Sequence, residues 1–215
     1  YRPGDDIRNM DWKATARLRK PHVRVYSEER ERPVLLVVDQ RTSMFFGSIR
    51  TTKATAAAEL AALAAWRALD GGDRVGAIIF SDDQVVEVRP HRSRKNVLRI
   101  CHELARVNQQ LTANGGHDGP ESLNDAFQRA AHLAHHDYLV ILATDFSGAD
   151  EATRRHATFL SSHNDVFAVM VYDPMGIQIP VAGEMDATDG LNPVSLPTNQ
   201  QFAERYLEAF RAKCA

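Results

Sequence analysis

Cysteine is scarce in this 215-residue chain, which contains only Cys101 and Cys214. Two thiols so far apart cannot form the dense disulfide framework that stabilises many small secreted domains. We therefore expect two free thiols in a protein of a reducing compartment. The predicted localisation is cytoplasmic.

Long apolar runs are also lacking. No stretch approaches the ~20 consecutive apolar residues that a helix needs to cross a bilayer, and no signal peptide is visible. The sequence predicts no membrane span in this chain. Because the chain begins with Tyr1 rather than methionine, it fits a fragment of a longer protein, and an upstream membrane anchor stays an open alternative.

Neither sign of charge dominates, since 26 lysines and arginines face 28 aspartates and glutamates and the formal net charge is -2. Such a balance favours neither nucleic acid nor an anionic membrane as partner. The arginines near the N-terminus are interleaved with Asp5, Asp6 and Asp11, which favours internal ion pairs. We predict no nucleic-acid partner.

The sequence motifs of several large enzyme classes are missing as well. The chain has no Gly-x-Ser-x-Gly nucleophile elbow, no P-loop and no Gly-x-Gly-x-x-Gly after a strand. Asp39-Gln-Arg41 lacks the second acid of an aspartyl-phosphate Asp-x-Asp motif. These absences predict a protein that is not an enzyme.

What the chain does contain is a set of short apolar runs that alternate with helical patterns. The first run, Val34 to Val38, is uninterrupted and rich in valine, as is typical of a central strand buried on both faces. Strands are predicted over 33–39, 74–80, 138–145 and 166–172. Helices are predicted over 51–69 and around 150–162, and three more are expected after Ser93, around Leu123 to Ala131 and after Thr198. The alternation predicts a doubly wound, mostly parallel α/β sheet with helices on both faces.

Several local features of these elements can be predicted. Val86 and Val88 alternate with charged residues and predict a hairpin strand, and Ser93 can cap the helix that follows. Thr198 with Gln201 predicts a capping box for the last helix. Three sets of residues are expected to face the core from the helices: Ala54, Ala57, Ala58, Ala61, Leu63 and Ala64; Val97, Leu98, Cys101, Leu104 and Ala105; and Phe202, Tyr206, Phe210 and Cys214.

The chain is predicted to consist of an N-terminal arm, residues 1–32, and one domain, residues 33–215. The arm is polar and too short to form a domain of its own. Its apolar side chains, Trp12 above all and then Val23, Val25 and Tyr26, are expected to anchor it on the domain. Near the other end, residues 176–196 predict a small hairpin or an edge strand.

Two of the predicted strands end in an aspartate, Asp39 and Asp145. The carboxyl ends of parallel strands meet at one edge of a sheet, so these carboxylates are expected in one crevice, with the hydroxyl groups of Thr42, Ser43 and Thr144 beside them. Carboxylate and hydroxyl oxygens suit a hard cation such as Mg²⁺. The alternative is that the aspartates only cap the helices that follow.

Asp39-x-Arg41-x-Ser43, the central helix, a Gly-rich loop before a later helix and Thr144-Asp145 together resemble a von Willebrand factor A-type domain. The resemblance implies a metal-ion-dependent adhesion site, which uses Asp-x-Ser-x-Ser, a threonine from a later loop and an aspartate after the fourth strand. Asp39, Ser43 and Asp145 match this pattern and are the predicted metal ligands, for Mg²⁺ or Mn²⁺.

The N-terminal arm resembles a bacterial family more specifically. Arg2-Pro-Gly-Asp-Asp-Ile-Arg-Asn-Met-Asp-Trp-Lys-Ala-Thr-Ala-Arg17, then Glu28-Glu29 and the first strand, are similar to the family named domain of unknown function fifty-eight. In that family the arm precedes a von Willebrand factor A-like domain. Its genes commonly neighbour those of MoxR-type AAA+ ATPases, which implies an adaptor or partner of such an ATPase.

The chain departs from the adhesion-site pattern in two places. Arg41 stands where the first serine is expected, and Pro120-Glu121-Ser122 stands near the expected threonine. A guanidinium group stays protonated and suits a carboxylate. We therefore predict a degenerate site in which Arg41 replaces the cation by bridging toward Asp39 or Asp145, with Mg²⁺ or Mn²⁺ bound weakly or not at all.

Two further clusters have a functional and a plain interpretation. His132-x-x-His135-His136 places two histidines one helical turn apart, which zinc can use, although histidines near a helix C-terminus usually bind nothing. The basic residues Arg89, His91, Arg92, Arg94 and Lys95 can hold a phosphate at a helix start. A solvated loop is the plainer interpretation.

The sequence thus predicts a non-enzymatic protein-interaction module with a degenerate metal site and a protein partner, plausibly a MoxR-type AAA+ ATPase. The alternative hypothesis is a Mg²⁺-dependent phosphoryl-transfer or hydrolytic enzyme that uses Asp39 and Asp145. Such an enzyme would need a general base or a cation for phosphate, and only Arg41 is near in sequence.

Overall fold

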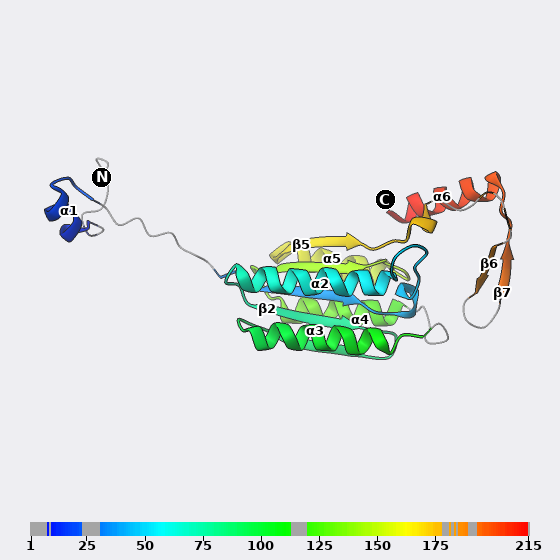
Figure 1. The fold of residues 1–215 in the computed structure, drawn as a ribbon, viewed down its shortest axis with the longest axis horizontal. Coiled ribbons are helices and arrows are strands. Elements are labelled where there is room, and N and C mark those ends of the chain that lie inside the picture. The colour runs from blue at the N-terminus through cyan, green and yellow to red at the C-terminus, as the bar shows by residue number, and fades with distance from the viewer. Residues whose placement is uncertain are drawn as a thin grey trace. The chain divides into compact units, whose positions relative to one another are not determined.

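The computed structural model describes residues 8, 10–22, 31–112, 120–177, 181, 183, 185–188 and 193–214. It divides into two compact units, Tyr1–Glu31 and Arg32–Ala215, and Figure 1 shows the elements of each. The boundary falls one residue before the predicted end of the arm. Each unit is described by itself.

The described residues of the first unit include a short helix, α1 (Trp12–Leu18). The carboxylate of Asp11 caps it by accepting a hydrogen bond from the backbone of Ala14 at 2.9 Å, and Arg19 ends it in the left-handed conformation at φ 51°. Trp12 is 64% exposed. The other expected anchors of the arm, Val23, Val25 and Tyr26, lie outside the described residues, so the docking of the arm stays a prediction.

The second unit is built on a five-stranded sheet with the order β3-β2-β1-β4-β5. Its strands are β1 (Val34–Asp39), β2 (Val75–Phe80), β3 (Val85–His91), β4 (Leu139–Thr144) and β5 (Asp165–Met170). All neighbours pair in parallel except β2 and β3, which form an antiparallel hairpin as predicted. The predicted central strand, β1, is the middle of the sheet.

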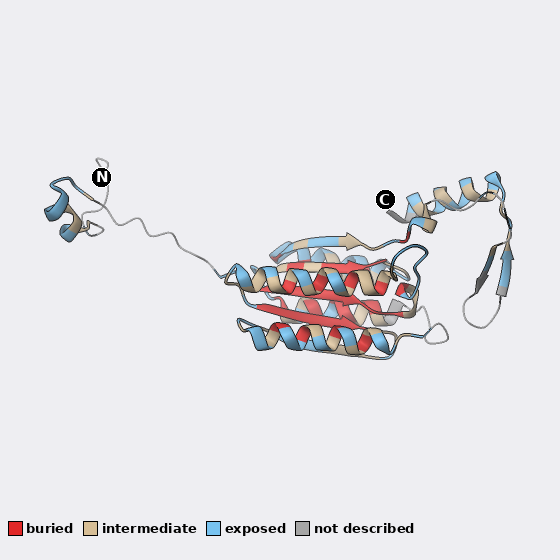
Figure 2. Ribbon diagram, viewed as in Figure 1, coloured by how far each residue is buried: buried red, intermediate tan, exposed pale blue. Residues whose placement is uncertain are grey.

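Helices cover both faces of this sheet (Figure 1). They are α2 (Lys53–Asp70), α3 (Arg94–Gln109), α4 (Pro120–Leu133) and α5 (Glu151–His163). Successive residues of β1 point to opposite faces, so Leu36 packs in the cluster under α2 and α3, whereas Leu35 packs in the cluster under α4 and α5. Figure 2 shows the buried strands between the helices. The predicted doubly wound, mostly parallel class is confirmed.

Four of the residues predicted to face the core are exposed instead: Leu63, Leu98, Ala105 and Tyr206. Leu63 of α2 is 71% exposed and Leu98 of α3 is 58% exposed. The rest of the predicted faces is largely confirmed, since Ala54, Ala57 and Ala61 of α2 and Val97 and Leu104 of α3 are buried; Ala65 and Ile100 lie in the core beside them. Because small alanines dominate α2, its apolar pattern is almost continuous, and the sequence does not fix which side meets the sheet.

The C-terminal part begins with a short 3-10 turn, η3 (Pro174–Gly176), after β5. A two-stranded antiparallel hairpin follows, β6 (Met185–Thr188) and β7 (Pro193–Leu196), and then α6 (Gln200–Cys214). The predicted small hairpin and last helix are confirmed. The ring of Phe210 on α6 contacts the ring of Tyr172, with 5.6 Å between their centroids.

The capping box predicted for α6 is wrong by one residue. The side chain of Asn199, rather than that of Thr198, accepts a hydrogen bond from the backbone of Phe202 at 2.8 Å, and the Thr198 hydroxyl donates to the backbone of Gly183. Either side chain can cap a helix, and here the Thr198 hydroxyl is engaged by Gly183 instead. Cys101 is a half-buried free thiol, and burial raises the pKa of that thiol.

Across the described ranges, the helices are too short or too polar to cross a membrane.

Candidate functional site

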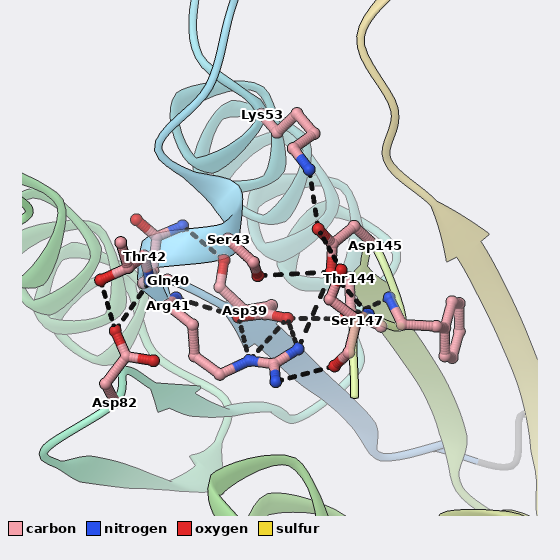
Figure 3. Close-up of polar contacts among 11 residues, drawn as sticks. Asp39, Gln40, Arg41, Thr42, Ser43, Lys53, Asp82, Thr144, Asp145 and Ser147 are labelled. Atoms are coloured by element: carbon pink, nitrogen blue, oxygen red, sulfur yellow. Dashed lines mark hydrogen bonds and ion pairs between the residues drawn. The ribbon is translucent and has the colours of Figure 1, made fainter. Parts of the chain in front are cut away.

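The site lies at the carboxyl edge of the sheet, where β1, β2 and β4 end next to one another (Figure 3). Parallel pairing brings Asp39 at the end of β1 beside Thr144 and Asp145 at the end of β4, as predicted. Asp82 comes from the turn after β2. We call the space between these three carboxylates the crevice.

Arg41 fills the centre of the crevice and is paired with Asp39 (Figure 3). Its Nε lies 3.0 Å from Asp39 Oδ1 and its Nη2 lies 2.7 Å from Asp39 Oδ2, so both carboxylate oxygens accept from one guanidinium group. Neither side chain is exposed. The remaining nitrogen, Nη1, donates to the backbone oxygen of Ser147 at 2.9 Å. Of the two partners predicted for Arg41, Asp39 is thus in direct contact.

Arg41 also approaches the second carboxylate of the crevice. Its Nη2 lies 3.8 Å from Asp145 Oδ1. The turn that holds Arg41 in place is the short 3-10 helix η2 (Thr42–Met44), whose last residue, Met44, is buried in the core. The guanidinium group therefore bridges the ends of β1 and β4.

The charge states of the pair follow from its surroundings. Burial raises the pKa of Asp39, while the hydrogen bonds and charge of Arg41 and the hydroxyl of Thr144, 2.6 Å away, act against burial. Burial alone would lower the pKa of Arg41, but its hydrogen bond to Asp39 and the charges of Asp39, Asp145 and Asp82 outweigh burial and raise it. Since both oxygens of Asp39 only accept hydrogen bonds, the geometry is that of a carboxylate beside a guanidinium cation.

A second cation, Lys53, neutralises Asp145. The Lys53 Nζ lies 2.7 Å from Asp145 Oδ2, and its side chain is 15% exposed. The backbone nitrogen of Ser147 donates to Asp145 Oδ1 at 2.8 Å, and the Ser43 hydroxyl lies 3.5 Å from the same oxygen. The sequence interpretation named Asp145 and Ser43 but missed Lys53. Its position offers a signal, because a residue that opens the helix after the first strand lies near the strand ends.

Further hydrogen bonds fix the loop that carries Arg41. The backbone and hydroxyl of Thr42 donate to Asp82 Oδ2 at 2.8 and 2.7 Å. The side chain of Gln40, which is fully buried, donates to the backbone oxygen of Ala54 at 2.8 Å and accepts from Asn108 at 2.8 Å. These contacts tie the loop to β2, α2 and α3. The sequence interpretation did not single out Gln40 or Asp82.

The residues present do not fit a divalent ion at the adhesion-site position. Both oxygens of Asp39 are held by Arg41, and both oxygens of Asp145 accept hydrogen bonds from Lys53 or Ser147. A cation placed between the two aspartates would face the positive charge of Arg41. Within the described residues, no group of three or more histidine, cysteine, aspartate or glutamate side chains has an arrangement for a metal ion.

The histidine cluster does not have the spacing that was predicted for zinc. Helix α4 ends at Leu133, so His136 lies beyond it and is not one helical turn from His132, which corrects the spacing predicted for zinc. Their Nδ1 atoms approach Gln128 O at 2.7 Å and Asp137 Oδ2 at 2.9 Å.

The basic residues before α3 are spread over separate contacts. The N-terminus of α3 is capped by the side chain of Ser93. Arg94 lies over the ring of Trp66, with 5.9 Å from the guanidinium carbon to the ring centroid. Arg89, with a side chain that is 89% exposed, pairs loosely with Glu87.

Comparison with known proteins identifies relatives of the whole chain. A family model described as protein of unknown function DUF58 matches residues 1–214. The uncharacterized protein Mb1516 of Mycobacterium bovis and the uncharacterized protein Rv1480 of Mycobacterium tuberculosis are each 31% identical over 195 residues, which is 89% of this chain and 59% of the relative. The chain therefore spans about three fifths of the length of these relatives.

Similar solved structures share little sequence with this chain. The proximal thread matrix protein 1 from the mussel byssus is 15% identical with a TM-score of 0.43, covering 64% of this chain and 37% of that protein. The SpRpn10 VWA domain is 9% identical with a TM-score of 0.36, covering 66% and 90%. An uncharacterized membrane spanning protein from Vibrio fischeri is 18% identical with a TM-score of 0.33, covering 86% and 87%. We draw no functional conclusion from scores at this level.

Proposed function

This chain is a member of the DUF58 family, and from that premise we propose that it is a non-enzymatic protein-interaction module and an adaptor or partner of a MoxR-type AAA+ ATPase. The identity of the proposed ATPase partner is inferred from the family resemblance of the arm and the domain. The proposed localisation is the cytoplasm, where ATP is available to such an ATPase.

The observation that carries the proposal is the buried ion pair of Arg41 with Asp39. An enzyme that transfers phosphoryl groups needs carboxylates free to hold metal or to take a proton. Here Asp39 is fully buried and Asp145 is 3% exposed, and each is neutralised by a cation of the chain itself. The crevice therefore supports a structural role: it fixes the loops at the carboxyl edge of the sheet in one arrangement.

We further propose that the crevice is a degenerate adhesion site in which Arg41 takes the place of the divalent ion. In support, Asp39, Ser43 and Asp145 match three ligand positions of the adhesion-site sequence pattern, and the guanidinium group lies between the two carboxylates. The chain then needs no cofactor, because the charge that Mg²⁺ or Mn²⁺ would supply is covalently attached.

A binding measurement with the purified ATPase tests the interaction. The chain is immobilised and titrated with a MoxR-type ATPase from the same organism, with ATP and without it. The Asp83→Arg variant reverses an exposed charge next to Asp82 at the carboxyl edge, and Asp70→Arg reverses an exposed charge at the C-terminal end of α2. Binding that is weakened by the first substitution and unchanged by the second supports the proposal, whereas no binding by the unmodified chain contradicts it.

The enzyme alternative has its own measurement. The unmodified chain is assayed with p-nitrophenyl phosphate and bis-p-nitrophenyl phosphate in the presence of Mg²⁺ or Mn²⁺. We expect no turnover above the buffer rate. Turnover that disappears in the Asp39→Asn variant would favour the enzyme over the interaction module.

A further inference from the structure

We propose that the loop between η2 and α2 is a preformed apolar docking element, and that its partner is a protein surface with an apolar groove. This inference rests on the proposed function and adds to it the chemistry of recognition. Phe45 is 40% exposed, Phe46 is 48% exposed and Ile49 is 79% exposed. Three large apolar side chains thus reach solvent from five consecutive residues.

This loop is held at both ends and in its middle, although its side chains are exposed. At its start the backbone of Phe45 donates to Thr42 at 2.8 Å, and Thr42 is bonded to Asp82. At its end the backbone nitrogen of Lys53 donates to the backbone oxygen of Phe46 at 2.8 Å. Lys53 is itself held by Asp145. Hydrogen bonds from Thr42 to Asp82 therefore hold the start of the loop, and the ion pair of Lys53 with Asp145 holds its end.

The middle of the loop is anchored to the segment after β5. The backbone of Ser48 donates to Asp173 Oδ2 at 2.8 Å, and its hydroxyl donates to Asp173 Oδ1. At Gly47 a Cβ atom would lie 2.2 Å from the backbone oxygen of Thr51, so the loop is closed too tightly for any other residue. A loop fixed in this way loses little conformational freedom on binding, which favours affinity.

Exposed aromatic and large aliphatic side chains are the usual anchors of protein interfaces, where a few residues supply most of the binding energy. A single exposed apolar residue needs no explanation, but this loop places three together on a rigid support. The crevice beside it offers no divalent ion to a partner carboxylate, because Arg41 and Lys53 occupy the carboxylates of the site. We therefore expect a partner to recognise the loop at this edge of the sheet mainly through apolar contacts.

The charges around the loop favour a protein over a membrane surface. Asp82 and Asp83 follow β2 next to the turn that starts the loop, and Asp83 is exposed. Arg50, with a side chain that is 82% exposed, lies 3.5 Å from Glu59. Peripheral membrane binding gains most from an excess of lysine and arginine near anionic lipid, and this region has no such excess among its described residues.

The test measures binding of the purified MoxR-type ATPase to the Phe45→Ser/Phe46→Ser double variant and to Ile49→Ser. The matched controls are Phe159→Ser on α5 and Phe167→Ser on β5, two phenylalanines that are 59% and 63% exposed on other elements. We expect the dissociation constant of the double variant to rise at least ~30-fold and that of Ile49→Ser by about threefold to tenfold. The controls should stay within about twofold of the unmodified chain.

The possible outcomes separate this inference from the proposed function. If the ATPase binds the unmodified chain and the double variant equally well, the proposal that this loop is a docking element is wrong, and the proposed function stands. If the ATPase does not bind the unmodified chain, the proposed function fails, and this inference fails with it. Circular dichroism melts of all variants show whether a loss of binding comes from unfolding.

A second experiment tests whether the loop binds a membrane instead. Vesicles of phosphatidylcholine with phosphatidylglycerol are sedimented with the unmodified chain and with the Phe45→Ser/Phe46→Ser variant. We expect neither to sediment with the vesicles. Sedimentation of the unmodified chain that is lost in the variant would overturn the assignment to a protein groove in favour of a lipid surface.

Discussion

The Nη2 atom of Arg41 lies 2.7 Å from Oδ2 of Asp39, and neither side chain has any surface exposed to solvent. Taking two opposite charges out of water is costly unless they satisfy each other with good geometry. Here the guanidinium group donates to both oxygens of Asp39 and to the backbone of Ser147. The pair is therefore held in one arrangement and links the ends of β1 and β4.

We predict that Arg41→Ala lowers the free energy of unfolding by about 3–5 kcal/mol, because it leaves the buried carboxylate of Asp39 without its counter-charge. Urea denaturation followed by circular dichroism measures this. The control is Arg154→Ala, which removes the exposed pair with Glu151 on α5 and should lower the stability far less, because solvent screens an exposed pair. Equal effects of the two substitutions would contradict a buried pair.

The Arg41→Ser variant tests whether the crevice keeps the shape of a metal site. The substitution removes the positive charge and supplies a hydroxyl ligand between Asp39 and Ser43, so we expect at least about tenfold tighter Mn²⁺ or Mg²⁺ binding than in the unmodified chain. Calorimetric titration of both proteins measures the difference, after circular dichroism has shown that the variant is folded.

Two results of this titration would contradict the prediction. No gain on Arg41→Ser would mean that the loop is not shaped for a metal. Tight metal binding by the unmodified chain, abolished by Asp145→Ala, would mean that Arg41 does not replace the ion.

Lys53 is predicted to stabilise the fold through Asp145. The Lys53→Met variant keeps the length of the side chain and removes its charge, and we expect a loss of about 1–2 kcal/mol, reduced from the value of a fully buried pair because Ser147 still donates to Asp145. Arg67→Met on the same helix is the control, since its pair with Asp70 is exposed. Chemical denaturation of both variants measures the loss in the free energy of unfolding. A smaller loss for Lys53→Met than for Arg67→Met would refute the prediction.

The contact of Ser48 with Asp173 predicts a loss of stability in acid. Burial alone would raise the pKa of Asp173, but the hydrogen bonds from Ser48 and Met175 and the charge of Lys53 outweigh burial and lower it from its ordinary value of 3.8. A lowered pKa in the folded state means that the stabilisation is present above the ordinary value and is lost as the pH falls through the folded pKa.

This prediction is measured by the melting temperature between pH 7 and pH 2 in the unmodified chain and in Asp173→Asn. The variant should be less stable by about 1 kcal/mol at pH 7. The difference between the two proteins should shrink below about pH 4. Parallel curves over the whole range would show that Asp173 does not contribute through its charge.

Much of the fold could be predicted from the sequence, because the apolar runs have the length and composition of buried parallel strands and the stretches between them have helical periodicity. The run from Val34 to Val38 predicted the central strand, and Ser93 predicted the start of α3. The phase of the alanine-rich α2 was not predictable at Leu63, since alanine packs against a sheet from any side. The capping residue of α6 was equally undetermined between two adjacent polar residues.

In the crevice the sequence by itself determined which residues meet, because parallel strands that end in Asp39 and Asp145 place these carboxylates at one edge of one sheet. It also predicted that Arg41 pairs with Asp39 or Asp145, since a guanidinium group in such a loop requires a carboxylate, and the tertiary structure decided for Asp39 as the nearer partner. Only the tertiary structure decided the roles of Lys53, Asp82 and Gln40, which come from other elements or point away from the strand. Those contacts depend on how far α2 and the turn after β2 lie from the end of β1, and helix packing sets that distance rather than any local pattern.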